Sequence, residues 1–203
     1  MIDVSTEFEQ ALENEERNFC VTLTINLQDG TVLDIDDSDL WSDGFTIDEA
    51  TSNSGSFDTG AAIIQKLTIR LNNIYGDFED YDFSRATISN VKVSLKLPSG
   101  KTESIQKGTY TVDEASHDGD VIVLECLDNM YRTDVSYENS KLTYPATLLQ
   151  IVQDCCGMTL AADSIDFTNC NYSITEKPSV DATFRDVLIW AGQISGHFWR
   201  CNN

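Results

Sequence analysis

The fold class is decided by residues 19–35, which read FCVTLTINLQDGTVLDI. From Phe19 to Leu27, apolar residues alternate with cysteine, threonine and asparagine, the pattern of a strand with one buried face. Asp29 and Gly30 then provide the two residues with positive φ that a tight hairpin turn favours. Residues 31–35 predict the returning strand, so this stretch indicates an antiparallel β-sheet.

The same two-residue period recurs along the chain and predicts further short strands, with turns at Pro98–Gly100 and His117–Asp120. Six or so strands at this spacing favour a closed or sandwiched sheet. The strands are expected within residues 63–71, 91–97, 105–112 and 121–127.

Helical patterns flank the predicted strands. Near the N-terminus, Thr6 and Glu9 have capping-box spacing. Later, a stripe with helical period predicts a helix that begins at Pro145 and ends at Gly157. Asp181 is the expected N-cap of a further helix, whose apolar face is Phe184, Val187, Leu188 and Ala191 and which ends at Gly196.

We therefore expect a mainly β protein of the α+β class with two domains. Residues 1–135 are predicted to form an antiparallel β-barrel with an N-terminal helix, and residues 136–203 a smaller α+β module. The first part has 27 acidic and 9 basic residues and the second 7 and 4, so the charge is uneven. Residues 198–201 predict a strand with no partner after it. The chain is thus expected to be the N-terminal part of a longer protein, with its second module truncated.

The formal charge of −21 argues against stable binding to DNA or to an anionic membrane. No run approaches the roughly 20 apolar residues that cross a bilayer, and residues 1–16 lack the features of a signal peptide. We expect the protein to be made and used without export, with its six cysteines reduced.

Three clusters suggest metal chemistry, and each has a simpler interpretation. Cys155, Cys156, Cys170 and Cys201 could form a thiolate zinc site, but adjacent cysteines chelate poorly and core packing is favoured. The acidic runs at residues 34–39 and 72–82 could bind calcium. A solvated loop is favoured for the first run, and a turn with aromatic anchors for the second, which could also contact a partner.

Catalytic motifs are not evident. His117 and His197 are the two histidines, and neither lies in a nucleophile, zinc-protease or phosphate-loop motif. Acid pairs are so abundant that they carry no information about glycoside cleavage. We expect no enzymatic activity, no cofactor and no metal.

Several strings, taken together and in this order, resemble the N-terminal region of tail proteins from phages and prophages of Gram-positive bacteria. The resemblance covers almost the whole chain, although no string alone is diagnostic. The strings are residues 18–19, 41–50, 57–62, 71–83, 127–130, 142–148 and 183–187.

This resemblance implies a baseplate hub-like protein, a virion structural component made in the bacterial cytoplasm. It implies a trimer or ring of β-barrel domains beneath the tail tube, with tube, distal tail and tape-measure proteins as partners. An acidic lumen would let DNA pass without sticking. The alternatives are a carbohydrate-binding module for host attachment and the scaffold region of a tail-associated cell-wall hydrolase. The candidate interaction residues are Trp41, Phe45, Asn73, Tyr75, Asp77, Phe78 and Tyr81.

Overall fold

The computed structural model describes residues 4–50, 59–157, 166–178 and 181–201. The chain forms two compact units whose sequences interleave. Unit 1 comprises the described residues of Met1–Asp48 and Lys66–Asp128, and unit 2 those of Glu49–Gln65 and Asn129–Cys201. The predicted division lies at residue 135, whereas the described residues 49–50, 59–65 and 129–135 belong to unit 2.

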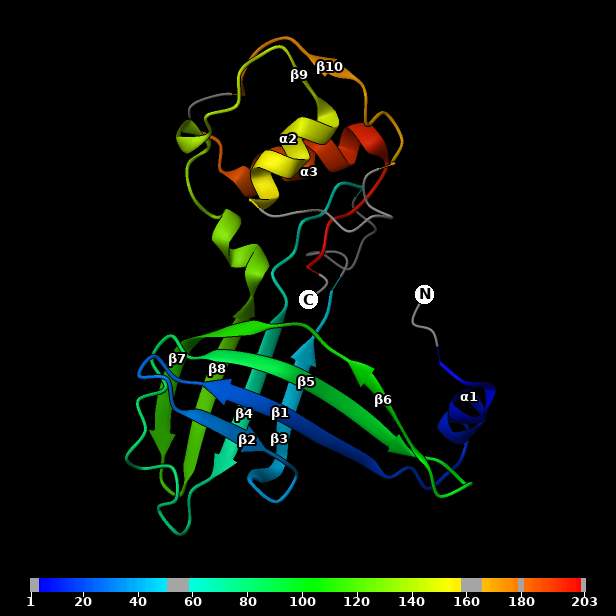
Figure 1. Cartoon of the computed structure of the whole chain (residues 1–203), viewed down its shortest axis with the longest axis vertical. Helices are drawn as coiled ribbons and strands as arrows, with labels where there is room; N and C mark the ends of the chain where they lie inside the picture. The colour runs from blue at the N-terminus through cyan, green and yellow to red at the C-terminus, as the bar shows by residue number, and fades with distance from the viewer. Residues whose placement is uncertain (1–3, 51–58, 158–165, 179–180, 202–203) are drawn as a thin grey trace. The chain divides into compact units, whose positions relative to one another are not determined.

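Unit 1 is an eight-stranded antiparallel sheet (Figure 1). The hairpin predicted from residues 19–35 is confirmed, with register from Leu23 opposite Ile35 to Asn26 opposite Val32. Together with the three helices among the described residues, this sheet confirms the prediction of a mainly β, α+β protein. The strands are β1 (Phe19–Asn26), β2 (Val32–Ile35), β3 (Leu40–Asp48), β4 (Lys66–Asn72), β5 (Thr87–Lys96), β6 (Thr102–Gln106), β7 (Tyr110–Asp118) and β8 (Val121–Asp128).

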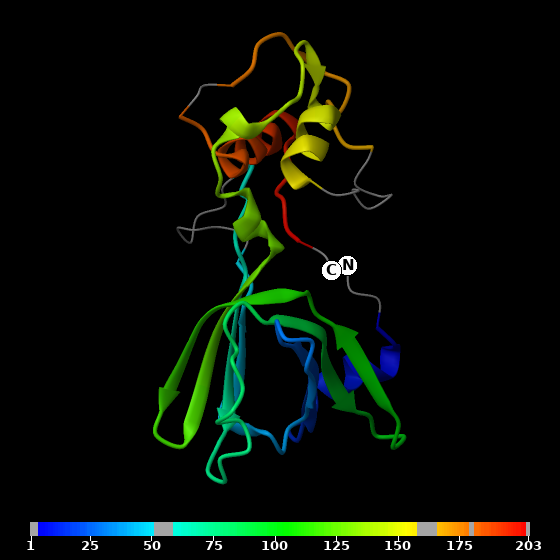
Figure 2. The ribbon, with the colours of Figure 1, turned by 60° about the vertical axis from the view of Figure 1, so that its left-hand side comes forward.

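The sheet curls because β5 changes partner along its length. Thr87 and Ile88 pair with β7, whereas Lys92–Lys96 pair with β6. The strand order is β2-β1-β5-β7-β8-β4-β3, and Figure 2 shows the curvature of the strands. The concave side of the sheet carries one apolar core. Residues of alternate positions fill this core, among them Leu23, Ile25, Leu67, Ile69, Leu71, Ile88, Ile122 and Leu124.

The edges of the sheet are β2, β3 and β6. Among the residues that the structure describes, no ladder joins β2 to β3, so hydrogen bonding does not close the sheet into a full barrel. β2 and β6 are short, and β3 has a register shift between Leu40 and Phe45. Short and bulged edge strands limit the pairing of a sheet with other chains.

Helix α1 (Thr6–Leu12) packs on one end of unit 1. Its N-cap is Ser5, whose hydroxyl accepts from the Phe8 amide, so the predicted capping box at Thr6 was one residue late. The apolar side, Phe8 and Ala11, packs with Leu95 and Leu97.

Unit 2 has its own apolar core beneath α2 (Leu148–Cys156) and α3 (Phe184–Ser195). The predicted ends at Gly157 and Gly196 are confirmed as left-handed C-caps. Both predicted starts were wrong, because Thr147 and Thr183 are the N-caps, each closed by a capping box. The other elements of the described residues are the 3₁₀ turns η1 (Asn129–Thr133) and η2 (Tyr137–Asn139) and the pair β9 (Ala146–Thr147) and β10 (Ser173–Ile174).

The segment that follows residue 58 is held in unit 2 by the C-terminal residues. The Gly60 amide donates to the His197 carbonyl at 2.9 Å, and the Trp199 amide donates to the Ala61 carbonyl at 2.8 Å. Ala62 and Trp199 form a parallel bridge. The expectation that residues 198–201 lack a partner was therefore wrong, because their partner lies far earlier in the chain.

The capping box of α3 makes the stability of unit 2 depend on pH. The Asp186 carboxylate accepts from the Thr183 hydroxyl at 2.7 Å and amide at 2.8 Å, and these hydrogen bonds lower its pKa. A lowered carboxyl pKa stabilises the fold above the unfolded value of about 3.9, and this contribution is lost as the pH falls through the folded pKa. Asp186→Ala should lower the free energy of unfolding by about 1 kcal/mol at pH 7, and by less at pH 3.

Urea unfolding of wild type and variant at both pH values measures this difference. Asp181→Ala is the matched control, because Asp181 is exposed and does not cap the helix. An equal effect of the two substitutions at pH 7 would contradict the assignment.

Candidate interaction surface

The loop between β4 and β5, residues 73–86, contains most of the acidic run and is tied down by hydrogen bonds. The Asn73 amide donates to the Asp120 carbonyl at 2.8 Å, and the Asn73 side-chain oxygen accepts from the Phe78 amide at 2.9 Å. The Phe78 side chain is only 8% exposed and belongs to the core of unit 1. The short turn between these anchors includes Gly76 at a φ of 77°.

This turn presents two large apolar side chains to solvent. Ile74 is 50% exposed and Tyr75 is 86% exposed, the highest value among the exposed large apolar residues of the described chain. Asp77, Glu79 and Asp80 follow within the same loop and are exposed. A rigid aromatic side chain loses little entropy on binding, so it is a typical anchor of a protein interface. We call residues 73–80 the Tyr75 loop.

The other candidate interaction residues of the acidic loop are placed differently. Phe78 lies in the core of unit 1. Tyr81 packs against this core and makes an edge-to-face contact with Phe83. Asn73 hydrogen-bonds within the loop, and Asp77 is exposed beside Tyr75. The interpretation as a turn with aromatic anchors therefore fits Phe78 and Tyr81, whereas Tyr75 and Asp77 are exposed to solvent.

Trp41 and Phe45, two further candidate interaction residues, lie in β3. Both are half-buried, and Phe45 packs against the core of unit 1. The extra residues between Leu40 and Phe45 form the bulge of this strand. The structure therefore does not bring Trp41 and Tyr75 into one loop. Ile74 was not predicted as an interaction residue. Its position next to Tyr75 in an acidic loop could have indicated that its side chain is exposed.

The acidic run at residues 34–39 uses its carboxylates in local hydrogen bonds. Asp36 accepts from the Ser38 amide and hydroxyl, which lowers the Asp36 pKa. Asp37 accepts from the Val21 amide at 2.8 Å, and Asp34 from the Thr24 hydroxyl at 2.9 Å. These contacts fit the interpretation as a solvated, self-capped loop.

The four cysteines considered as a zinc site all contact the core of unit 2. Cys155 and Cys170 are buried, whereas Cys156 and Cys201 are partly buried. Burial raises the pKa of Cys155, and that of Cys156 to about 11, which disfavours the thiolate form that binds metals. Among the described residues, no group of three or more His, Cys, Asp and Glu side chains could hold a metal ion.

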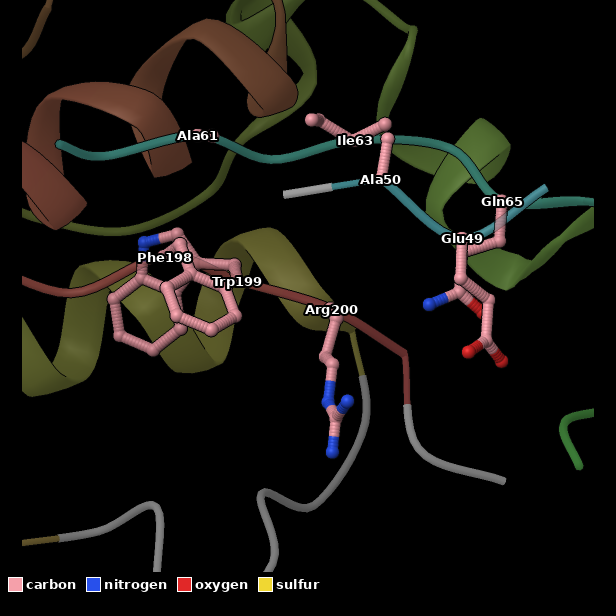
Figure 3. A pocket seen from close by; sticks show the side chains of 8 residues that line it. All are labelled: Glu49, Ala50, Ala61, Ile63, Gln65, Phe198, Trp199 and Arg200. Carbon is pink, nitrogen blue, oxygen red and sulfur yellow. The ribbon is translucent and has the colours of Figure 1, made fainter. Parts of the chain in front are cut away.

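A small pocket of unit 2, shown in Figure 3, has a volume of about 130 Å³. This is below the roughly 300 to 1,000 Å³ of typical ligand sites. The Trp199 indole donates to the Leu188 carbonyl at 2.8 Å and packs edge-on against Phe167, so Trp199 has a packing role here. The pocket is lined by Glu49, Ala50, Ala61, Ile63, Gln65, Phe198, Trp199 and Arg200.

The histidines lie far apart in the sequence and in different units. His117 is exposed on β7, and the His197 ring nitrogen Nδ1 lies 2.8 Å from the Ser195 carbonyl oxygen. Within the described ranges, no helix is both long enough and apolar enough to cross a bilayer.

Comparison with known proteins shows only remote likeness. No protein-family model and no curated protein matches the chain. Among solved structures, the chain is similar to one from the virion of a native gene transfer agent particle, with a TM-score of 0.41 and 12% sequence identity. The match covers 70% of this chain and 50% of that one, so the chain spans half the length of that protein.

Proposed function

We propose that this chain is a structural component of a phage or prophage tail, of the baseplate hub type, which works by binding other protein subunits. Its partners are further copies of itself, in a trimer or larger ring, and the adjacent tube, distal tail and tape-measure proteins. It acts in the virion tail, after synthesis in the bacterial cytoplasm, and it is not an enzyme.

The observation that carries this proposal is the Tyr75 loop. Two large apolar side chains on a hydrogen-bonded turn take no part in the core of unit 1, and such exposed groups typically bind a partner. The blunted edges of the sheet make strand pairing a weaker route to association. The order of the tail-protein strings in the sequence supports the same class of protein.

The mass in solution tests the proposal. Light scattering should give a trimer or a larger ring for the wild type, and Tyr75→Ala should weaken association roughly thirtyfold, as loss of an interface anchor does. Tyr172→Ala is the matched control, because Tyr172 is 58% exposed in unit 2 and should leave association unchanged. A monomer at every concentration, with no binding to tail proteins, would overturn the proposal.

A further inference from the structure

The side chain of Gln65, the residue before β4, is buried and unpaired in the part of the chain that the structure describes. Gln65 is 8% exposed, and its amide can both donate and accept hydrogen bonds. None of the described residues forms a hydrogen bond with this side chain. Buried polar groups are nearly always hydrogen-bonded, because an unpaired one has lost its contacts with water. The burial of Gln65 therefore has no explanation in the packing of unit 2.

Gln65 lines the small pocket of unit 2 (Figure 3). Apart from Gln65, the polar side chains of the lining are Glu49 and Arg200, and the others are apolar. Apolar walls with a few polar groups that fix orientation are typical of ligand sites. The two charged side chains have opposite signs, so the lining has no net charge and favours a neutral ligand.

The volume of the pocket determines how much of a ligand can enter it. At about 30 Å³ for each water in the liquid, the 130 Å³ of the pocket holds about four non-hydrogen atoms. A sugar ring with its hydroxyls is larger than this, but an acetamido group has that size. Its carbonyl oxygen can accept a hydrogen bond from the Gln65 amide, and its methyl group suits walls such as Ala61 and Ile63.

An aromatic surface adjoins the pocket. Phe198 belongs to the lining and is 44% exposed, so its ring offers solvent an apolar face. The indole N–H of Trp199 is already donated to the Leu188 carbonyl, so Trp199 contributes its ring to the wall and not a further donor. A ring that carries the acetamido group can therefore rest on Phe198 while the group itself enters the pocket.

We infer that this pocket binds the acetamido group of an N-acetylated amino sugar. Gln65 Nε2 donates to the acetamido carbonyl oxygen, Gln65 Oε1 accepts from a sugar hydroxyl, and the sugar ring lies against Phe198. The ligand is neutral, as the lining requires. Binding of a glycan by unit 2 goes beyond the proposed structural function and does not depend on the Tyr75 loop of unit 1.

Saturation-transfer NMR of the full chain with N-acetylglucosamine tests the inference. The acetamido methyl protons should receive the strongest saturation, with a dissociation constant on the order of 1 mM for a ligand of this size. Glucose, which has a hydroxyl in place of the acetamido group, should bind about tenfold more weakly, because it leaves Gln65 unpaired. No saturation transfer, or equal transfer to glucose, would overturn the inference.

A peptide that carries the same group distinguishes sugar from peptide recognition. N-acetylglycine methylamide should bind about tenfold more weakly than the sugar, because it lacks the ring that lies against Phe198. Phe198→Ala should remove this difference between the two ligands. Equal binding of the peptide and the sugar by the wild type would show that the pocket recognises peptides, and the inference would be wrong.

The variant Gln65→Met removes the amide and keeps the volume of the side chain. It should weaken binding of N-acetylglucosamine about tenfold, and its urea midpoint should equal or exceed that of the wild type, because no hydrogen bond within the protein is lost. Gln153→Met, at an exposed glutamine of α2, is the matched control and should leave binding unchanged. Undiminished binding by Gln65→Met, or a lowered midpoint, would contradict the inference. The mass in solution is a separate measurement, so either result leaves the proposed function standing.

Discussion

Replacing Gly192 by alanine should lower the free energy of unfolding of unit 2 by about 3 kcal/mol. In the interior of a helix such as α3, alanine is ordinarily more stable than glycine by about 1 kcal/mol. Here a Cβ would lie 2.6 Å from the Gly60 Cα, 2.8 Å from the His197 carbonyl oxygen and 2.9 Å from the Trp199 Nε1. The Gly60 Cα and the His197 carbonyl oxygen are backbone atoms, so the backbone at Gly60 and His197 must move to make room for the Cβ.

Urea unfolding followed by tryptophan fluorescence measures this effect, because Trp190 and Trp199 both lie in unit 2. Gly108→Ala in unit 1, followed by Trp41 fluorescence, is the control, since a Cβ there would make only ordinary contact with the Tyr110 ring at 3.5 Å. That variant should be as stable as the wild type or slightly more so. An unchanged urea midpoint for Gly192→Ala would contradict the close approach of Gly192 to the backbone of Gly60 and His197.

Replacing Ile69 by alanine should lower the free energy of unfolding of unit 1 by about 3 to 4 kcal/mol. Ile69 is fully buried on β4, opposite Phe45 on β3 and Leu124 on β8. Strands on both sides hold its neighbours in place, so the cavity cannot readily collapse. The lost apolar contacts and the unfilled volume both destabilise the fold.

Substitutions that remove different amounts of buried volume distinguish cavity formation from a general loss of stability on mutation. Ile69→Val should lose about 1 kcal/mol, and Val32→Ala, at a position 58% exposed on β2, about 0.5 kcal/mol or less. Denaturant unfolding with Trp41 fluorescence reports on unit 1. Equal losses for Ile69→Ala and Val32→Ala would contradict the core assignment.

Local patterns in the sequence predicted most of the strands, because burial on one face of a sheet imposes a period of two. The single strand predicted at residues 105–112 was wrong, because that stretch holds the end of β6 and the start of β7, and β3 was not predicted. The hairpin of β1 and β2 follows directly from that period and from Asp29 and Gly30. Helix ends were less predictable. At α3, Asp181 and Thr183 both favour an N-cap, and the capping box with Asp186 selects Thr183.

Long-range pairing lay beyond sequence patterns. The bridge between Ala62 and Trp199 joins two short segments. Neither segment is long enough for its hydrophobic pattern to indicate which other segment it pairs with. The candidate surface shows a related limit. Tyr75 and Phe78 are aromatic residues of one acidic loop, and only tertiary packing determines that Phe78 is buried and Tyr75 exposed.

The interleaving of the two units has a consequence for the order of events on the ribosome. Residues 60–62 emerge early, whereas Trp199 emerges about 140 residues later, which at about 5–20 residues per second is a delay of roughly 7 to 28 s. During that interval Ala61, Ala62, Ile63 and Ile64 have no native partner from the C-terminal segment. Unit 1, whose strands are all translated by Asp128, can form first. The apolar segment at residues 61–64 is then the part of the nascent chain for which we expect chaperones to compete.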